Sequence, residues 1–347
     1  MKVVIEPKIK SLASPKASDT LFYVGNLPIH GRAVLSPMAG VSDSPHRLLA
    51  RSKGSAWSFT EFVAAEQINL GNPKAIRLFH HEPDEDPVWF QIFGNSVESI
   101  TSAAQRIEPL NPKIIDLNMG CSVQRVSQGG SGAGLLKNLP LAGRMIESLC
   151  KNISVPVTAK IRIGWYNDSL NYRETIHVLQ ESGVSAISVH GRTKEMAYTG
   201  FANWDVIAEI KSFAKVPIFG NGDIDSVSLM QKRLRESKVD AVLIGRAAIG
   251  NPWIFAGIEK ISLSILEINE VAWSHYLAMK KFYDRDAFIL FKKYFTKYFH
   301  DFEDYKKDKD AILRIRNEIE FEETWLSSLE RYTRNFNLYF IQQKRPA

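Results

Sequence analysis

The chain has 347 residues, 45% hydrophobic and 24% charged, so it can bury a large core and is expected to form one large domain and a smaller one. Its net charge of +6 is compatible with a polyanionic partner, although many proteins without such a partner are equally basic. Two cysteines, Cys121 and Cys150, without a CxxC spacing, exclude a disulfide framework and a cysteine zinc cluster, and we expect no metal site.

The sequence shows no targeting or membrane segment. The stretch from Met1 to Val24 contains four lysines but no continuous apolar run. No later segment approaches the roughly 20 apolar residues that a membrane-spanning helix needs. We therefore expect a cytoplasmic protein that does not enter a membrane.

Short apolar runs alternate with helical patterns from about Arg32 to Phe255. Amphipathic stretches between the runs are long enough to be crossover helices, for example Ser96–Ile107, Leu141–Lys151, Tyr172–Ser182 and Ser226–Glu236. Eight such units in roughly 220 residues favour an α/β fold of the (β/α)8 TIM-barrel type over an open doubly wound sheet. The expected strands are Ala33–Pro37, Trp57–Glu61, Val88–Phe93, Ile114–Leu117, Val157–Ile161, Ala186–Val189, Pro217–Gly220 and Ala241–Ile244.

The strand pattern stops after Phe255 and helical periodicity replaces it. Phenylalanines at 288, 291, 295, 299 and 302 recur at steps of three and four residues, which predicts a helix with one apolar stripe. The sequence therefore predicts an N-terminal extension over 1–30, a TIM barrel over 31–258 and a small all-α domain over 259–347.

A cysteine follows the fourth expected strand at the point where the strand gives way to a loop. The run from Ile114 to Leu117 ends in Asn118-Met119-Gly120-Cys121. The carboxyl ends of parallel strands meet at one face of a barrel, where ligands bind. A thiol there can act as nucleophile, metal ligand or proton donor, and the neighbouring residues must decide which.

Glycine and polar residues follow the other strands in the same way. Asn221-Gly222-Asp223 and Gly245-Arg246 come after the last two strands, a corner that commonly holds a phosphate because backbone amides and an arginine face the anion. Lys160 and Gln91 offer a cation and an amide to a polar ring system across the barrel mouth, as a flavin requires. The sequence thus predicts a phosphorylated cofactor or substrate at this face.

Six motifs, taken in order, resemble those of the tRNA-dihydrouridine synthases, and the bacterial B-type branch looks most similar. They are Pro-Met-Ala-Gly-Val-Ser-Asp at 37–43, Asn-Met-Gly-Cys at 118–121, Ala-Lys-Ile-Arg-Ile-Gly-Trp at 159–165, His-Gly-Arg-Thr at 190–193, Gly-Asn-Gly-Asp-Ile at 220–224 and Ile-Gly-Arg-Ala-Ala-Ile-Gly-Asn-Pro-Trp at 244–253. The resemblance implies an FMN-dependent enzyme that reduces the C5–C6 double bond of specific uridines in tRNA to 5,6-dihydrouridine, with NADPH as electron donor.

The resemblance also implies residue roles. Reduced FMN would deliver hydride to C6 of the uracil, and Cys121 would protonate C5; an ordinary thiol is protonated at neutral pH and suits an acid. The residues implied to bind FMN are Pro37, Met38, Ala39, Gln91, Lys160, Asn221, Gly222, Asp223, Gly245 and Arg246. The residues implied to face the uridine and its backbone are Asn118, Arg162 and His190.

Two features near Cys121 modify this picture. The family usually has Pro after the catalytic Cys, and here Ser122 stands in that place, which removes a constraint on φ and is expected to loosen the loop. The glycine-rich run at 129–134 fits neither GxGxxG nor the Walker A pattern, so we interpret it as part of a mobile loop carrying Cys121.

The helical domain is expected to contribute to tRNA binding. Lys292, Lys293 and Lys297 occupy other faces of the helix that carries the apolar stripe, and the resemblance places a basic pair near Lys292-Lys293. An equally simple reading is a solvated basic face on a packing helix.

Two alternative functions stay open. Another FMN barrel, such as a dihydroorotate dehydrogenase, would share the phosphate corner, Lys160 and a loop cysteine, but it would not need a basic helical appendage. A non-catalytic tRNA-binding protein would keep the basic surface but is expected to lack Cys121 or Lys160, and both are present. We expect the chain to act as a monomer with tRNA as its partner.

Overall fold

The structure is a computed structural model that describes the backbone of residues 17–343 and the side chains of residues 18–332. The first part of the expected N-terminal extension, residues 1–16, lies outside the described residues. The described residues form two compact units, one of residues up to 248 together with 253–257, the other of 249–252 together with the residues from 258 onward. Within the described range, no helix is long and apolar enough to cross a membrane.

Eight parallel strands form a closed barrel, so the predicted TIM-barrel fold is confirmed. Pairing of β4 with both β3 and β6 completes the ring, and β5 (Val63–Ala64) adds to the end of β6. Each expected strand is present, although β4 is shorter than expected and β7 runs on to Met119. The barrel strands are β3 (Ala33–Leu35), β4 (Ser58–Phe59), β6 (Val88–Phe93), β7 (Ile114–Met119), β8 (Val157–Arg162), β9 (Ala186–His190), β10 (Ile218–Asn221) and β11 (Ala241–Ile244).

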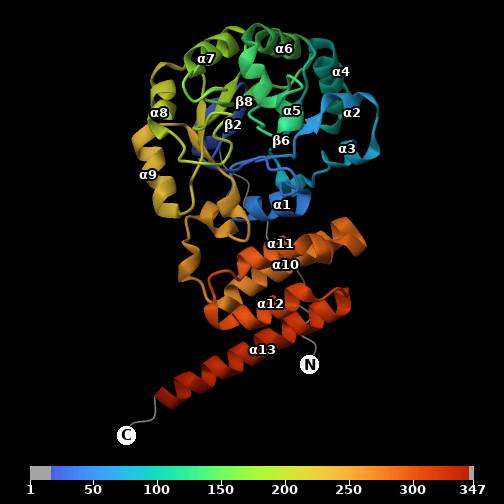
Figure 1. Ribbon diagram of the computed structural model, residues 1–347, viewed down its shortest axis with the longest axis vertical. Helices are drawn as coiled ribbons and strands as arrows, with labels where there is room; N and C mark the ends of the chain where they lie inside the picture. The colour runs from blue at the N-terminus through green and yellow to red at the C-terminus, as the bar shows by residue number, and fades with distance from the viewer. Residues whose placement is uncertain (1–16, 344–347) are drawn as a thin grey trace. The chain divides into compact units, whose positions relative to one another are not determined.

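Helices cover the outside of the barrel (Figure 1). Their amphipathic patterns explain this placement: in the segment from Val97 to Ile107, for example, the buried residues Ile100, Ala103, Ala104 and Ile107 recur at steps of three and four. Side-chain caps start several helices, as where the Ser96 hydroxyl accepts from the Ser99 amide. The helices are α1 (Ser44–Ser52), α2 (Ala65–Asn69), α3 (Pro73–Arg77), α4 (Val97–Ile107), α5 (Gln124–Ser127), α6 (Leu139–Asn152), α7 (Tyr172–Glu181), α8 (Trp204–Phe213) and α9 (Val227–Ser237).

A hairpin that the sequence did not reveal closes the amino-terminal end of the barrel. It consists of β1 (Phe22–Val24) and β2 (Leu27–Ile29), joined at Gly25, whose φ of 58° favours glycine. Val24 and Ile29 are buried in one cluster with large side chains from the barrel interior, among them Trp57, Phe59, Trp89 and Phe219. The apolar end of the barrel is therefore sealed, and polar chemistry is confined to the opposite end.

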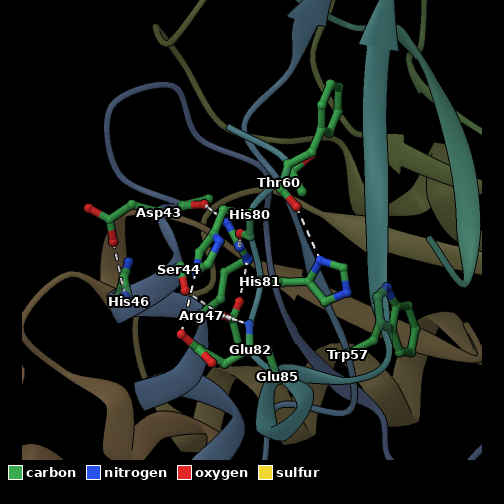
Figure 2. Close-up of polar contacts among 12 residues, drawn as sticks. Asp43, Ser44, His46, Arg47, Trp57, Thr60, His80, His81, Glu82 and Glu85 are labelled. Atoms are coloured by element: carbon green, nitrogen blue, oxygen red, sulfur yellow. Dashed lines mark hydrogen bonds and ion pairs between the residues drawn. The ribbon is translucent and has the colours of Figure 1, made fainter. Parts of the chain in front are cut away.

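A buried ion pair fastens the segment before β6 to α1. Figure 2 shows Ser44 and Arg47 of α1 pointing toward Glu85, which lies in a short 3-10 helix (Pro83–Glu85). Arg47 Nε lies 2.8 Å from Glu85 Oε2, and the Ser44 hydroxyl and the Glu82 amide donate to the other carboxylate oxygen. Burial raises the pKa of Glu85, while the Arg47 guanidinium opposes that rise. These contacts fix α1 and hence the loop before it, which follows β3.

The second unit is helical, as predicted. Its helices are α10 (Ile265–Tyr283), α11 (Ala287–Tyr298), α12 (Lys306–Arg314) and α13 (Glu318–Gln343). The predicted apolar stripe is buried at positions 288, 291, 295 and 299, but α11 ends at Tyr298, so Phe299 is its C-cap residue and Phe302 lies beyond the helix. Phe291 stacks on Trp325 of α13 with ring centroids 5.6 Å apart. Aromatic packing of this kind accounts for the dense phenylalanine content of the segment.

Candidate active site

Side chains inside the barrel change from apolar to polar along the strands. Residues two apart on a strand point to the same face, so Ile114, Asp116 and Asn118 of β7 form one column. Ile114 belongs to the sealed apolar cluster, whereas Asn118 lies at the carboxyl end of the strand. The polar side chains therefore lie at the carboxyl ends of the strands, and the apolar cluster lies beneath them inside the barrel.

Asn118 fixes the loop that carries Cys121. Its Oδ1 accepts hydrogen bonds from the backbone amides of Gly120 at 3.0 Å and Cys121 at 2.9 Å. Asparagine commonly organises a turn in this way. The Cys121 side chain is partly buried, and burial raises the pKa of its thiol. The thiol is therefore protonated at neutral pH, as a proton donor requires.

The glycine-rich run is not the loop that we expected. Residues Gly132–Lys137 form a largely buried 3-10 helix, and the Ala133 amide donates to the Cys121 carbonyl at 3.1 Å. Gly132 has a φ of 55°, and a Cβ there would lie 3.1 Å from the Cβ of Cys121. The run is thus packed against the cysteine, because glycine permits this close approach.

Lys160 lies beside Asn118 in the pairing of β8 with β7. Its ammonium donates to Asn221 Oδ1 at 3.0 Å, and Asn221 Nδ2 donates to the Leu243 carbonyl at 2.8 Å. Desolvation by burial, with a smaller effect of Arg162, lowers the pKa of Lys160 to about 8. Lys160 and Asn221 were both predicted site residues, and the structure brings them together.

Gln91 joins Asn118 to a residue that the sequence analysis did not select. Gln91 Oε1 accepts from Asn118 Nδ2 at 2.8 Å, and Gln91 Nε2 donates to Asp116 Oδ2 at 2.7 Å. Asp116 is fully buried, and desolvation raises its pKa to about 6. A carboxylate between the apolar residues Ile115 and Leu117 was the sequence signal that could have identified it.

Arg162 holds two loops together. Its Nε donates to the Gly120 carbonyl, and its Nη1 donates to the carbonyls of Thr193 and Ala197 at 2.7 and 3.0 Å. Nη2 reaches the Ser122 hydroxyl at 3.3 Å. Serine therefore supplies a hydrogen bond at the position where the family usually has the stiffer proline.

His190 lies among cations. Arg192 Nη1 is 3.3 Å from His190 Nε2, and since a guanidinium only donates, Nε2 accepts and the proton is on Nδ1. Burial, reinforced by Lys160, Arg162, Arg192 and Arg246, lowers the pKa of His190 well below its ordinary value. His190 is thus a neutral imidazole whose Nδ1–H can donate a hydrogen bond, and its neighbours are positively charged.

Asp223 organises the predicted phosphate corner. Its carboxylate accepts from Arg192 Nη2 and from the Ala202 amide, both at 2.7 Å, and lies 3.5 Å from Arg246. Arg192 was not among the predicted site residues, although it belongs to the His-Gly-Arg-Thr motif. Glycine is required at 222, because φ is 127° and a Cβ would lie 2.5 Å from that of Ala202.

The remaining predicted FMN residues lie at the ends of β3 and β11. The Met38 amide donates to the Ser42 hydroxyl at 2.9 Å, which shapes the turn that follows Pro37 and includes Ala39. A Cβ added to Gly245 would lie 3.5 Å from the Met38 sulfur. Arg246 is 65% exposed, so its guanidinium can reach an anion in solution.

Two acids near the turn after β3 have local structural roles. Asp43 caps α1 by accepting from the His46 amide at 3.0 Å. Glu61 accepts from the Gly40 amide in the turn after β3. Among the residues that the structure describes, no group of three or more His, Cys, Asp or Glu side chains is arranged to hold a metal ion.

The three predicted lysines of α11 differ in their surroundings. Lys292 is partly buried and donates to the carbonyls of Leu313 and Ile315 at the end of α12. Lys293 and Lys297 are exposed, and Lys293 lies over the Tyr294 ring at 4.9 Å. Lys292 therefore has an internal role, which leaves Lys293 and Lys297 as the accessible cations of this set.

Comparison with known proteins identifies the family. The model of the family described as dihydrouridine synthase (Dus) matches residues 34–336. The chain belongs to the dihydrouridine synthase family. The resemblance seen in the motifs is thereby confirmed, and a dihydroorotate dehydrogenase-like reading loses its support.

Relatives named tRNA-dihydrouridine synthase B are similar to most of the chain. The protein of Pseudomonas aeruginosa is 39% identical over 237 residues, which are 68% of this chain and 71% of the relative. That of Xanthomonas campestris is 37% identical over 235 residues, with the same shares. A probable tRNA-dihydrouridine synthase of Rickettsia prowazekii is 32% identical over 275 residues, 76% of this chain and 84% of the relative.

Solved structures agree on the fold alone. A histamine dehydrogenase from Rhizobium sp. 4-9 matches with a TM-score of 0.53 at 12% identity, over 72% of this chain and 48% of that one. A 2-naphthoyl-CoA reductase matches with a TM-score of 0.52 at 12% identity, over 67% of this chain and 50% of that one. This chain spans about half the length of both proteins.

Proposed function

We propose that this protein reduces the C5–C6 double bond of specific uridines in tRNA in the cytoplasm, with FMN as bound cofactor and NADPH as electron donor. Membership of the dihydrouridine synthase family supports the reaction, and the names of the relatives support tRNA as the substrate. The observation that carries the proposal is the pairing of Asn118 on β7 with Lys160 on β8, because it puts a protonated thiol and a buried cation on neighbouring strand ends.

The residues present fit a flavin. The ammonium of Lys160 has three N–H groups, yet within residues 17–343 it has one hydrogen-bond acceptor, Asn221. A buried ammonium with unused donors calls for a further acceptor, and the carbonyl and nitrogen edge of an isoalloxazine ring supplies one. Arg246, whose side chain is 65% exposed beside Asp223, likewise suits a phosphate. The site thus offers a donor for the isoalloxazine ring of FMN and a cation for its phosphate.

A bound flavin supplies the hydride that C6 of the uracil receives. Cys121 Sγ then donates its proton to C5, and its raised pKa keeps that proton on sulfur until the carbon accepts it. Asn118 holds the backbone on which the thiol is mounted. His190 Nδ1–H is available to donate to an oxygen of the uracil or of the sugar–phosphate chain.

The tRNA surface extends beyond the barrel in our proposal. A flipped uridine needs little more than the barrel mouth, whereas a folded tRNA needs phosphate contacts over a long surface. The exposed Lys293 and Lys297 of α11 offer such contacts in the helical unit. We therefore assign the barrel to catalysis and the helical unit to tRNA affinity.

The proposal is tested with purified protein and unmodified tRNA transcripts. The protein is expected to be yellow, to release FMN on denaturation, and to form dihydrouridine when NADPH is added. Mapping dihydrouridine in tRNA from a strain lacking the gene identifies the position. Release of FAD, or no dihydrouridine in any tRNA with flavin-loaded protein, contradicts the proposal.

A further inference from the structure

Asp116 is a buried carboxylate that the proposed reaction does not use. It pairs across the ladder with Gln91 on β6 and Thr158 on β8, so the three side chains lie at one level inside the barrel. Its Oδ1 accepts from the Thr158 hydroxyl at 2.6 Å, and its Oδ2 accepts from Gln91 Nε2 at 2.7 Å. Burying an acid costs free energy, so its retention in an apolar strand calls for a reason.

The hydrogen bonds from the cysteine loop to Asp116 run in one direction only. The backbone amides of Gly120 and Cys121 can only donate, so the side-chain atom of Asn118 that faces them must be its oxygen. Asn118 Nδ2 must then donate to Gln91 Oε1, which turns Gln91 Nε2 toward position 116. Position 116 must therefore present an acceptor.

We propose that Asp116 is a positioning residue, which by anchoring Gln91 and Asn118 sets the placement of the Cys121 loop for proton donation. Three consecutive side-chain contacts of 2.7 to 2.9 Å connect its carboxylate to the Cys121 amide. The inference deepens the proposed function and rests on it for the role of Cys121. The same chain also fixes the amide of Gln91, which is predicted to face the flavin.

A purely structural role for Asp116 predicts a different outcome, and Thr158 provides the matched control. Thr158→Val removes a buried hydrogen bond to the same carboxylate but leaves the chain to Cys121 intact. Asp116→Leu removes the acceptor that Gln91 needs. Asp116→Asn keeps an acceptor for Gln91, because its amide can donate to the adaptable Thr158 hydroxyl instead.

The test measures two properties of Cys121 in the flavin-containing protein. The first is the rate of alkylation by iodoacetamide, followed by mass spectrometry, with exposed Cys150 as the internal reference in every sample. The second is the single-turnover rate of dihydrouridine formation by pre-reduced protein. In Asp116→Leu we expect the loop to loosen, with Cys121 alkylated about fivefold faster and turnover slowed at least about fivefold, the effect of losing one buried hydrogen bond.

Thr158→Val and Asp116→Asn are expected to match the wild type in both measurements, within about twofold, although Thr158→Val loses thermal stability. Equal effects of Thr158→Val and Asp116→Leu, or no effect of Asp116→Leu, overturn the inference. If Asp116→Leu does not fold, Gln91→Met breaks the chain at its next link, and unchanged Cys121 alkylation in that variant overturns the inference. A wild type that forms no dihydrouridine refutes the proposed function, whereas the alkylation rates still decide the role of Asp116.

Discussion

Arg162 Nε donates a hydrogen bond to the carbonyl oxygen of Gly120 at 2.8 Å, which ties the end of β8 to the loop that carries Cys121. The same guanidinium also binds the carbonyls of Thr193 and Ala197. Arg162 was predicted to face the substrate, and one of its five N–H groups lacks an acceptor among the residues that the structure describes. A single side chain thus holds the Cys121 loop and keeps one N–H group for a further acceptor.

Arg162→Lys is expected to lower kcat more than it raises KM. Lysine keeps the charge but loses the planar fork that holds carbonyls of two loops at once. The Cys121 loop then loses its contact at Gly120, so we expect kcat to fall about tenfold or more, as for the loss of one or two charge-assisted hydrogen bonds. Steady-state kinetics with a tRNA transcript check this. A change confined to KM would make Arg162 mainly a substrate contact.

Cys121→Ala separates proton donation from flavin chemistry. Without the thiol, we expect dihydrouridine formation to slow by about 10²–10⁴-fold, the usual contribution of a general acid. FMN content and flavin reduction by NADPH are expected to stay at wild-type levels, and stopped-flow absorbance measures both. Cys150→Ser is the control, since Cys150 lies on α6, away from the strand ends. Equal loss of flavin reduction in Cys121→Ala would assign Cys121 to the cofactor instead.

Arg246→Ala is expected to weaken FMN retention by about tenfold, the loss of one charge-assisted contact to a phosphate. Its guanidinium is 65% exposed and lies 3.5 Å from Asp223, so the substitution removes a cation without opening the core. Fluorescence titration of the flavin-depleted protein with FMN gives the Kd. Arg235→Ala, an exposed arginine of α9, is the matched control. An unchanged Kd in Arg246→Ala would move the phosphate away from this corner.

The fold could be predicted from sequence because its signals are local. Each barrel strand contains a short apolar run, and residues such as Asn118 and Lys160 lie in the carboxyl-terminal halves of their strands, so the parallel topology brings them to one end of the barrel. The β1–β2 hairpin could not be predicted from the sequence, because its three-residue strands are too short to show a periodicity and the proline in Leu27-Pro28-Ile29 is unusual in a strand.

The partners of the site side chains could not be predicted in the same way. That Asp116 meets Gln91 depends on the register of two strands, which no local pattern encodes. Lys292 shows the same limit: it looked like an accessible cation, but the packing of α12 puts two backbone carbonyls against it. The assigned roles of the site residues stay predictions until variants are measured.

The lysines of α11 are expected to separate into one that supports the fold and two that bind tRNA. Lys293→Gln with Lys297→Gln should weaken tRNA binding and reduce the slope of log Kd against log salt by up to about two units, one for each phosphate contact. Lys292→Met should instead lower the unfolding free energy by about 1–2 kcal/mol, because methionine has no N–H group and the carbonyls of Leu313 and Ile315 lose their donor. Fluorescence anisotropy at several salt concentrations and chemical denaturation check the two outcomes. An unchanged salt slope in the double variant would place the tRNA surface elsewhere.

The pKa of Asp116 predicts a stability difference that depends on pH. Burial raises this pKa from 3.8 to about 6, so between those values the folded protein holds a proton that the unfolded chain has released. Stability therefore falls as the pH rises through this window. Asp116→Asn has no such proton, so the unfolding free energy of the wild type relative to this variant should decrease by about 2.4 kcal/mol from pH 4 to pH 7, since one pKa unit corresponds to about 1.4 kcal/mol and the unfolded chain has already released part of its proton at pH 4. Denaturant titrations of both proteins at several pH values measure this difference in unfolding free energy. A difference that stays constant with pH would mean that Asp116 has the same pKa in the folded protein as in the unfolded chain. The hydrogen bonds from Gln91 and Thr158 would then offset the whole effect of burial on that pKa.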